Sequence, residues 1–328
     1  MQIAFEVIKI LNDGKFHSGA QIAKSLRVSR TSIWKAIQFL EALGVSIDAV
    51  RAKGYRLYHP LDLLNKPMIF SELSKEILAD MNRLEVLQSV PSTNDYLLAQ
   101  IPYGLKSFSA CVSETQTSGK GRQGKVWQSP YGRNIYLSLY WKSSCVFRGL
   151  SGLSLVLGMA ILKALESLQP LPQGLGIKWP NDIYFKERKL GGILIETQTD
   201  NKTAQTHIVM GIGLNVDIPE DKESQWTGLN AAFSGGIQRN QLCGLLLQHI
   251  IQAIRVFENK SFSAFHSDWK QYDLLSQNTV TISAGAHEEE GFCLGVNERG
   301  ELLVEVHNIL RALTYGDVSI RRSHVVAN

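Results

Sequence analysis

The stretch GKGRQGKVWQSPYGRNIYLSL, residues 119–139, places a glycine-rich basic loop directly before a run that alternates like a β-strand. The loop nearly matches the P-loop motif G-x-x-x-x-G-K-[ST], but Val126 stands where that motif supplies a hydroxyl to Mg²⁺. A P-loop also leads into a helix whose first turn holds phosphate, whereas NIYLSLYW (134–141) predicts a strand. The stretch therefore predicts an anion-binding loop of another kind, joined to a β-sheet.

The side chains of this loop favour a ligand that has both an anionic group and a flat heterocycle. Lys120, Arg122 and Lys125 supply positive charge, and Trp127 offers a flat ring face. The alternative is a mobile surface loop followed by a core tryptophan, and composition alone does not exclude it.

The chain around the loop, residues 67–272, alternates helix and strand patterns, so we expect one mixed sheet with helices packed on it. Helices are expected near 71–80, 93–101, 151–168 and 240–258. Strands are expected near 109–114, 134–141, 175–179, 182–186, 191–197 and 206–216.

Four shorter motifs in this region contain residues suited to ligand binding: PSTND (91–95), KWPND (178–182), KERKLGG (186–192) and GIGLN (211–215). In PSTND, Ser92 or Thr93 fits the N-cap of a helix, and the alternative is that these side chains hydrogen-bond a polar ring. KWPND joins two strands by a turn, which places Lys178 and Asp182 at one end of the sheet. KERKLGG is a charged hairpin with Lys189 ahead of two glycines, and the two glycines of GIGLN lie at a strand end, where a ligand or a backbone can approach closely.

The N-terminal residues predict a winged helix-turn-helix over 1–63. Residues 1–60 contain nine Lys or Arg and four Asp or Glu, so this segment carries a formal charge of +5. Because the whole chain carries +4, the remaining residues together carry −1. If the protein has a polyanionic partner, that partner should therefore bind here. The candidate DNA-binding residues are Gly19, Arg30, Thr31, Ser32, Lys35, Gln38 and Lys53. The alternative is a three-helix packing module with a solvated basic face.

Composition limits the remaining possibilities. The 328 residues are 44% hydrophobic and 20% charged, and no apolar run approaches the roughly 20 residues of a membrane span. Four scattered cysteines without a C-x-x-C pair favour reduced thiols in the cytoplasm and no structural metal. Residues 276–328 alternate as short strands and predict a small β module, and Pro60 with Asn65-Lys66-Pro67 predicts a linker at about 61–66.

Taken together, these motifs resemble the family of bifunctional biotin–protein ligases and biotin operon repressors along nearly the full chain. The resemblance rests on STN (92–94), Gln116, the 119–139 stretch, KWPND, RKLGGILIE (188–196) and GIGLN, and on AKGYRL (52–57) for the repressor subclass. It implies an α+β multidomain protein: a winged helix-turn-helix, a catalytic domain over 67–272 and an SH3-like barrel over 276–328, with GDVSIR (316–321) resembling the family's ending. It also implies ATP-dependent formation of biotinoyl-5'-AMP and transfer of biotin to a lysine of the biotin carboxyl carrier protein of acetyl-CoA carboxylase.

The resemblance assigns roles to residues by motif. Biotin would contact Ser92, Thr93, Asn94, Gln116, Gly119, Lys120, Gly121, Arg122, Lys189 and Gly192. ATP or the adenylate would contact Arg122, Trp127, Asn181, Asp182, Lys189 and Asn215, with Asp182 beside Mg²⁺. Catalysis would rest on Arg122, Lys189 and Lys178, and the loop would be mobile when empty and ordered by ligand.

The same resemblance implies operator DNA as a partner and a homodimer that forms when ligand is bound. Two other readings remain: a biotin-responsive transcription factor without ligase turnover, and an acyltransferase of the related lipoate type. The loop also departs from the family pattern G-R-G-R-x-G-R at Lys120 and Lys125, which keep the charge but lose the planar guanidinium.

Overall fold

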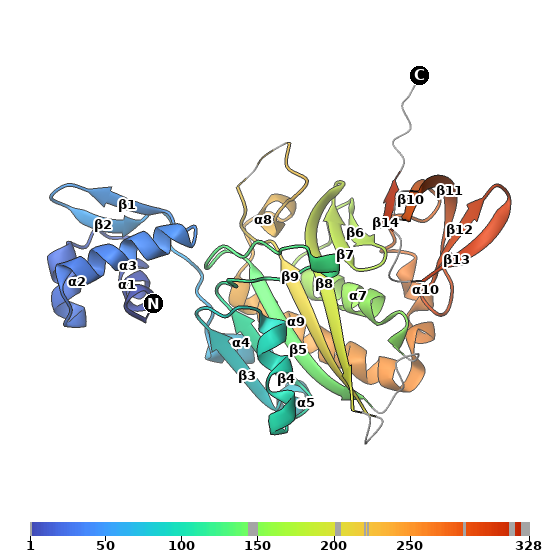
Figure 1. The fold of residues 1–328 in the computed structure, drawn as a ribbon, viewed down its shortest axis with the longest axis horizontal. Helices are drawn as coiled ribbons and strands as arrows, with labels where there is room; N and C mark the ends of the chain where they lie inside the picture. The colour runs from blue at the N-terminus through green and yellow to red at the C-terminus, as the bar shows by residue number, and fades with distance from the viewer. Residues whose placement is uncertain are drawn as a thin grey trace.

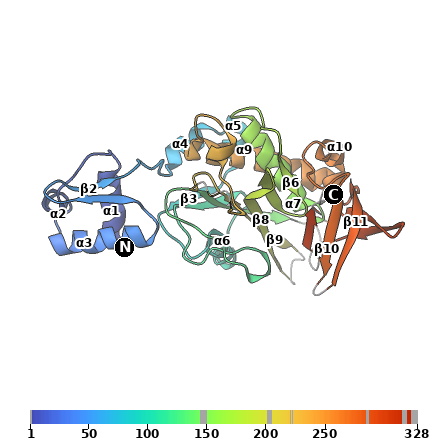
Figure 2. The ribbon, with the colours of Figure 1, turned by 90° about the horizontal axis from the view of Figure 1, so that it is seen from above.

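The computed structural model describes residues 2–143, 150–200, 205–219, 221, 223–284, 287–314 and 319–322. Three bodies follow one another along the chain, as Figures 1 and 2 show: a small helical module, a large α/β body and a small C-terminal sheet. Among the described residues, no helix is both long and apolar enough to cross a membrane.

The N-terminal module is a helix-turn-helix followed by a two-stranded wing, as predicted. Its elements are α1 (Gln2–Leu11), α2 (Gly19–Leu26), α3 (Arg30–Ala42), β1 (Ile47–Val50) and β2 (Gly54–Leu57). Ser18 accepts a hydrogen bond from the Gln21 N–H in a capping box that starts α2, and Ser29 accepts one from the Ser32 N–H at the start of α3. These caps fix where the two helices begin.

The central body is a seven-stranded mixed sheet in the order β3-β4-β5-β9-β8-β7-β6. Its strands are β3 (Arg83–Leu87), β4 (Ser109–Ser113), β5 (Ile135–Ser143), β6 (Leu175–Lys178), β7 (Asp182–Phe185), β8 (Arg188–Thr199) and β9 (Thr206–Leu214). Its helices are α4 (Lys66–Ser71), α5 (Lys75–Asp80), α6 (Thr93–Leu98), α7 (Leu153–Glu166), α8 (Leu229–Ala232), α9 (Arg239–Lys260) and α10 (His266–Trp269).

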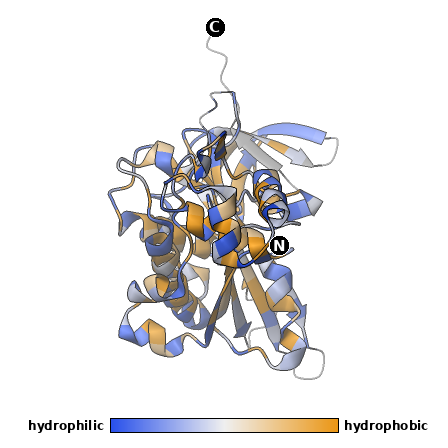
Figure 3. Cartoon of the chain, turned by 90° about the vertical axis from the view of Figure 1, so that its left-hand side faces the viewer, coloured by the Kyte–Doolittle hydropathy of each residue, from blue (hydrophilic) through white to orange (hydrophobic). Residues whose placement is uncertain are grey.

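Helices cover both faces of this sheet. Figure 2 shows α4, α5, α7 and α9 on one face and α6 on the other. Helix α7 is buried along almost its whole length, which matches its nearly uninterrupted apolar sequence. The hydropathy colouring of Figure 3 shows hydrophobic residues gathered where the helices meet the sheet. The site described below lies where the loops leave this core.

The prediction of one helix over 71–80 was wrong, because two short helices occupy 66–80. Ser74 accepts a hydrogen bond from the Ile77 N–H and starts the second helix. Strand β3 was not predicted, and it pairs in parallel with β4. Its sequence, RLEVL, is short and carries charges, so pairing with a neighbour decides its conformation.

The C-terminal body is an antiparallel sheet in the order β13-β12-β11-β10-β14. Its strands are β10 (Thr279–Ala284), β11 (His287–Val296), β12 (Leu302–Val306), β13 (Ile309–Leu313) and β14 (Ser319–Arg322). The pairings of the described residues do not close this sheet into a barrel. Strand β13 was not predicted. Part of the GDVSIR stretch lies outside the described residues. Cys145 also lies outside them.

The segment predicted as a linker, 61–66, is attached to the protein at each residue from 61 to 65, and α4 begins at Lys66. We call residues 61–65 the strap. Side chains that hydrogen-bond its backbone come from both bodies: Asn12 bonds Leu61, Arg239 bonds Asp62, Asn240 bonds Leu63 and Asn65, and Glu114 bonds Leu64. The strap is therefore a structural element rather than a free linker.

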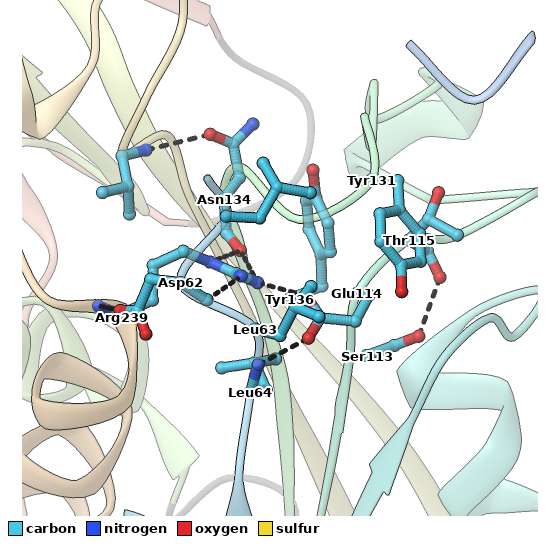
Figure 4. A network of polar contacts seen from close by, with 12 residues as sticks. Asp62, Leu63, Leu64, Ser113, Glu114, Thr115, Tyr131, Asn134, Tyr136 and Arg239 are labelled. Atoms are coloured by element: carbon cyan, nitrogen blue, oxygen red, sulfur yellow. Dashed lines mark hydrogen bonds and ion pairs between the residues drawn. The ribbon is translucent and has the colours of Figure 1, made fainter. Parts of the chain in front are cut away.

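A buried ion pair anchors the strap. Arg239 Nη2 lies 2.9 Å from Glu114 Oε2, and the two side chains are 3% and 0% exposed. The Arg239 guanidinium also donates to the Asp62 and Asn134 carbonyl oxygens, and Glu114 Oε1 accepts from the Leu64 N–H (Figure 4). Both charges are thus hydrogen-bonded on several sides, which offsets the cost of removing them from water.

Replacing Arg239 with alanine should lower the free energy of unfolding by about 3–5 kcal/mol, because Glu114 would remain charged and buried without an oppositely charged partner. Urea denaturation followed by circular dichroism measures this change. The control is Lys163→Ala, which breaks an exposed pair with Asp268 and should cost under about 1 kcal/mol. Equal effects of the two substitutions would contradict the prediction.

Candidate functional site

A cavity of about 220 Å³ opens at one end of the central sheet, beneath the glycine-rich loop. The loop, the start of α6, the turn between β6 and β7, and strands β8 and β9 line it. The lining includes five cations, Lys120, Arg122, Lys125, Lys178 and Lys189, and one carboxylate, Asp182. This charge balance suits an anionic ligand.

The glycine-rich loop, residues 119–128, is a short hairpin. Lys120 and Val126 form an antiparallel bridge, and the Trp127 N–H donates to the Gly119 carbonyl at 2.9 Å. Gln123 has a φ of +54°, an unusual backbone conformation for a residue with a side chain, so the tip of the hairpin is strained.

Two cations of the hairpin reach across the mouth of the cavity. Arg122 Nη1 donates to Asn181 Oδ1 at 2.8 Å, which ties the loop to the turn between β6 and β7. Lys120 Nζ lies 2.6 Å from Asp95 Oδ1 on α6, and this hydrogen bond raises the pKa of the Lys120 ammonium. The hairpin is thus positioned as a lid over the cavity.

Polar side chains on the opposite wall form a connected network. Ser92 caps α6, as expected from its sequence, with its Oγ accepting from the Asp95 N–H. The Thr93 N–H and hydroxyl both donate to Gln116 Oε1, at 2.9 and 3.1 Å. Asn94 Nδ2 donates to Glu196 Oε2 at 2.7 Å. Because the network fixes the orientation of each amide, it can present a defined set of donors and acceptors to a ligand.

Lys189 and Asp182 face each other on neighbouring strands at the floor of the cavity. Lys189 Nζ forms an ion pair with Asp182 Oδ1 at 2.6 Å, and among the described residues this buried oxygen has no hydrogen-bond partner. A bulge between Ile183 and Tyr184 shifts the register that aims Lys189. Gly192 lies opposite Asp182, where a Cβ atom would come within 3.3 Å of Oδ1.

Trp127 and Trp226 pack edge to face at the other end of the cavity, with ring centroids 5.5 Å apart. Lys189 Nζ lies 5.8 Å from the Trp127 ring centroid and 5.6 Å from that of Trp226. Among the described residues, the buried Trp127 Nε1–H has no hydrogen-bond partner. A buried donor of this kind suits a ligand acceptor.

The two glycines of GIGLN make room for side chains of the protein itself. A Cβ atom on Gly211 would lie 2.5 Å from Asn94 Oδ1, and one on Gly213 would lie 2.6 Å from the Trp127 ring. The expectation that a ligand or a backbone approaches these glycines is therefore revised, since two site side chains occupy that space.

The structure brings most of the predicted ligand residues to this one cavity: Ser92, Thr93, Asn94, Gln116, Lys120, Gly121, Arg122, Trp127, Lys178, Asn181, Asp182, Lys189 and Gly192. Gly119 lies at the neck of the hairpin, where a Cβ atom would lie 2.5 Å from the Trp127 carbonyl oxygen. Asn215 lies in a second cavity of about 340 Å³, which shares Trp127 and Trp226 with the first.

Sequence reasoning missed Ser138, Glu196 and Trp226. Ser138 Oγ donates to Asn94 Oδ1 at 2.5 Å, and Glu196 accepts from the same amide. Both residues lie within strands, where alternation gives a weak signal of function. Glu196 ends the quoted motif RKLGGILIE, which was the available clue.

The acidic residues limit the kind of metal site that the protein can form. Among the described residues, no group of three or more His, Cys, Asp and Glu side chains could hold a metal ion. Asp182 is a single carboxylate already paired with Lys189. Mg²⁺ is commonly held by one or two carboxylates together with substrate phosphates, so Asp182 fits an ion that arrives with a nucleotide.

The outward face of α3 carries the predicted DNA-binding side chains. Arg30, Thr31, Lys35 and Gln38 are exposed, while Ser32 is partly buried with its Oγ 2.9 Å from Ser29 Oγ. Ser32 thus contributes to the helix cap. Trp34 lies on the same face, is 54% exposed, and was missed by the sequence analysis.

The wing and the start of α2 contain the remaining candidates. Lys53 is exposed at the tip of the wing, with its Nζ 5.8 Å from the Phe16 ring centroid, whereas Arg56 lies 4.5 Å from the same centroid and is also held by Asp48 at 2.7 Å. Gly19 begins α2 and packs against Tyr55 of the wing. Lys53 is therefore the better placed of these two wing cations to contact a phosphate.

Comparisons with known proteins give matches to both the N-terminal module and the central body. Residues 86–215 match the model of the biotin/lipoate A/B protein ligase family, and residues 4–56 match an HTH domain. The Escherichia coli bifunctional ligase/repressor BirA is 35% identical over 323 residues, which cover 97% of each chain. The Bacillus subtilis protein of the same name is 28% identical, covering 93% of this chain and 94% of its own.

A solved structure extends the likeness to the fold. The biotin protein ligase from Aquifex aeolicus, in complex with biotin and ATP, superposes with a TM-score of 0.64 at 30% identity. The match covers 74% of this chain and 100% of that one. Since the identity to a bifunctional ligase/repressor extends through both the helix-turn-helix and the α/β body, this chain belongs to the BirA family of bifunctional ligase/repressors.

Proposed function

We propose that this chain is an ATP-dependent biotin–protein ligase that also represses transcription from an operator. In the first step an oxygen of the biotin carboxylate bonds to the α-phosphorus of ATP, the bond to the β-phosphate oxygen breaks, and pyrophosphate leaves. In the second step a lysine amine of the biotin carboxyl carrier protein of acetyl-CoA carboxylase attacks the mixed anhydride and releases AMP.

The observation that carries this proposal is the pairing, in one cavity, of a fixed polar network with five cations. The network of Ser92, Thr93, Asn94 and Gln116 suits the ureido ring of biotin, which has both donors and acceptors. The cations suit the carboxylate and phosphates that must meet at the other end. Two negatively charged reactants approach each other only where their charge is offset.

Roles follow from position in the cavity. Lys189, on the floor, would lie beside the biotin carboxylate and the α-phosphate, with Lys178 and Asn181 at the same end. Arg122 and Gly119 to Gly121 would close over the ligand. The site then acts by positioning and charge neutralisation, without a covalent intermediate on the protein.

The tryptophan pair supports a nucleotide beside biotin. Trp127 and Trp226 line both cavities, and Asn215 lines the second. We place the adenine there, against a ring face of Trp127. Mg²⁺ would enter bound to the phosphates of ATP. Asp182 would help to hold it, and the ion would offset phosphate charge there.

The C-terminal sheet supports this end of the site. Trp179, which lines the cavity, donates from Nε1 to the Gly300 carbonyl at 3.1 Å, and Ser151 Oγ donates to the Arg299 carbonyl at 2.5 Å. We propose an SH3-like module over 276–328 that holds this wall, joined to a ligase domain over 67–272 and a DNA-binding domain over 1–63.

For repression, we propose that α3 enters the major groove and that Lys53 contacts a phosphate. A homodimer formed when the adenylate is bound would pair two such modules on an operator. ATP and operator DNA both occur inside cells, which supports action in the cytoplasm.

Incubation with ATP, biotin and apo carrier domain tests the ligase proposal. Mass analysis should show biotin on one carrier lysine and, without carrier, biotinoyl-adenylate held by the protein. A carrier that stays unmodified contradicts the ligase proposal, and preferential use of lipoate in competition contradicts the choice of substrate.

Replacing Arg122 with alanine should speed the release of biotinoyl-adenylate by about tenfold or more, because the lid would lose its bond to Asn181 and a cation facing the phosphate. A pulse-chase with labelled biotin measures the release rate. Lys106→Ala, which removes an exposed cation from the same body, is the control and should leave the rate unchanged. Unaltered release from Arg122→Ala contradicts the role of the lid.

Replacing Lys53 with alanine should weaken binding to all DNA sequences alike and lower the slope of log affinity against log salt by about 1. Fluorescence anisotropy with an operator duplex at several salt concentrations gives this slope. Lys106→Ala removes the same charge away from the module and should leave the slope as it is. If both variants change it equally, net charge rather than a phosphate contact is responsible.

A further inference from the structure

Tyr131 belongs to the loop that leaves the ligand lid, yet its side chain lies in the core of the DNA-binding module. It follows the lid by three residues, in SPYG (129–132). Its side chain is fully buried among the apolar residues of α1, α2 and α3. Its ring stacks on Phe5 of α1, with centroids 5.7 Å apart and planes at 11°.

The backbone and hydroxyl of Tyr131 contact two further segments. The Tyr131 N–H donates to the carbonyl of Leu43, the C-cap residue of α3, at 3.1 Å. The hydroxyl donates to Gln88 Oε1 at 2.5 Å, at the start of the segment that leads from β3 to the polar network of the cavity. Burial raises the pKa of this hydroxyl, so it remains a neutral donor at physiological pH.

Neighbours on both sides hold the same turn. Pro130 lies against Gly44, just beyond α3, and a Cβ atom on Gly132 would lie 2.9 Å from Leu61 of the strap. On the lid side, the Ser129 carbonyl accepts from Thr115 Oγ1 at 2.6 Å, and Ser129 Oγ accepts from Gln116 Nε2 at 3.2 Å. The turn thus joins the cavity wall to the DNA-binding module. Figure 4 places Tyr131 beside the Glu114 and Arg239 network that anchors the strap.

We propose that Tyr131 is a positioning residue for the ligand lid, and that its docking between Phe5 and Leu43 couples lid closure to the placement of the DNA-binding module. This inference rests on the proposed role of residues 119–128 as the lid over biotin and its adenylate.

The physical reason is the number of residues that ligand must order. When Tyr131 is docked, the C-terminal end of the lid is already fixed. Binding of the ligand then has to order only the hairpin. If the ring is undocked, ligand must also order the turn, and the conformational entropy lost by each residue that becomes ordered opposes binding. By reciprocity, bound ligand favours the docked module as much as the docked module favours ligand.

Kinetics on the full chain test this proposal. Tyr131→Ala and Phe5→Ala should each raise the KM for biotin and the release rate of biotinoyl-adenylate by about tenfold, with kcat changed far less. Tyr131→Phe keeps the stacked ring and should restore values close to the original. The double variant should be no worse than either single one, because both remove the same contact.

Ile22→Ala is the matched control. It opens a cavity in the same core from α2, which lies at the end of the module farthest from the central body in Figures 1 and 2. Ile22→Ala should leave KM and release unchanged. If it acts as strongly as Phe5→Ala, the effect comes from loss of the module's fold and the proposal is overturned.

Two other outcomes are decisive. If Tyr131→Ala leaves KM and release unchanged while Arg122→Ala speeds release, the coupling is overturned and the lid remains. If neither variant alters release, the lid assignment itself fails, and the coupling fails with it. Additive effects in the double variant would also overturn the proposal, because the two side chains would then act independently.

Discussion

The buried ion pair between Arg239 and Glu114 is the constraint on which the arrangement of this molecule depends. Two opposite charges at almost zero exposure are stable only while each keeps its partner and its hydrogen bonds. Here the hydrogen-bond partners include the backbone of the strap, so the chain between the two bodies cannot leave its course without taking hydrogen bonds away from two buried charges. One polar contact thereby fixes the course of the strap that joins the DNA-binding module to the ligase body.

The site has a different kind of order. Its polar wall is rigid, because Asn94 and Gln116 are held by other side chains. Its cationic lid is a hairpin held mainly at its two ends and by Arg122 and Lys120. Such a division suits a reaction that must recognise a neutral ring closely and then enclose a reactive anhydride away from water.

The sequence predicted much of the candidate site, since most of its residues lie in short motifs at turns and strand ends. Thirteen of the predicted ligand residues line the cavity. Those it missed, Ser138, Glu196 and Trp226, lie in strands or in a segment without a motif, where residue type carries no positional information. Strand β3 and the break before α5 were also missed, because pairing and a single cap decided them.

By itself, the sequence determined the order of the three bodies, the basic N-terminal module and the chemistry of the lid, since charge, helix periodicity and glycine spacing are local properties of the chain. Only the tertiary structure decided that 61–65 is an anchored strap, that the C-terminal strands form an open sheet among the described residues, and that Tyr131 lies in the core of the other module. The anchoring of the strap and the place of Tyr131 depend on contacts between residues 49 to 177 positions apart, and local patterns do not encode the partner of a buried side chain.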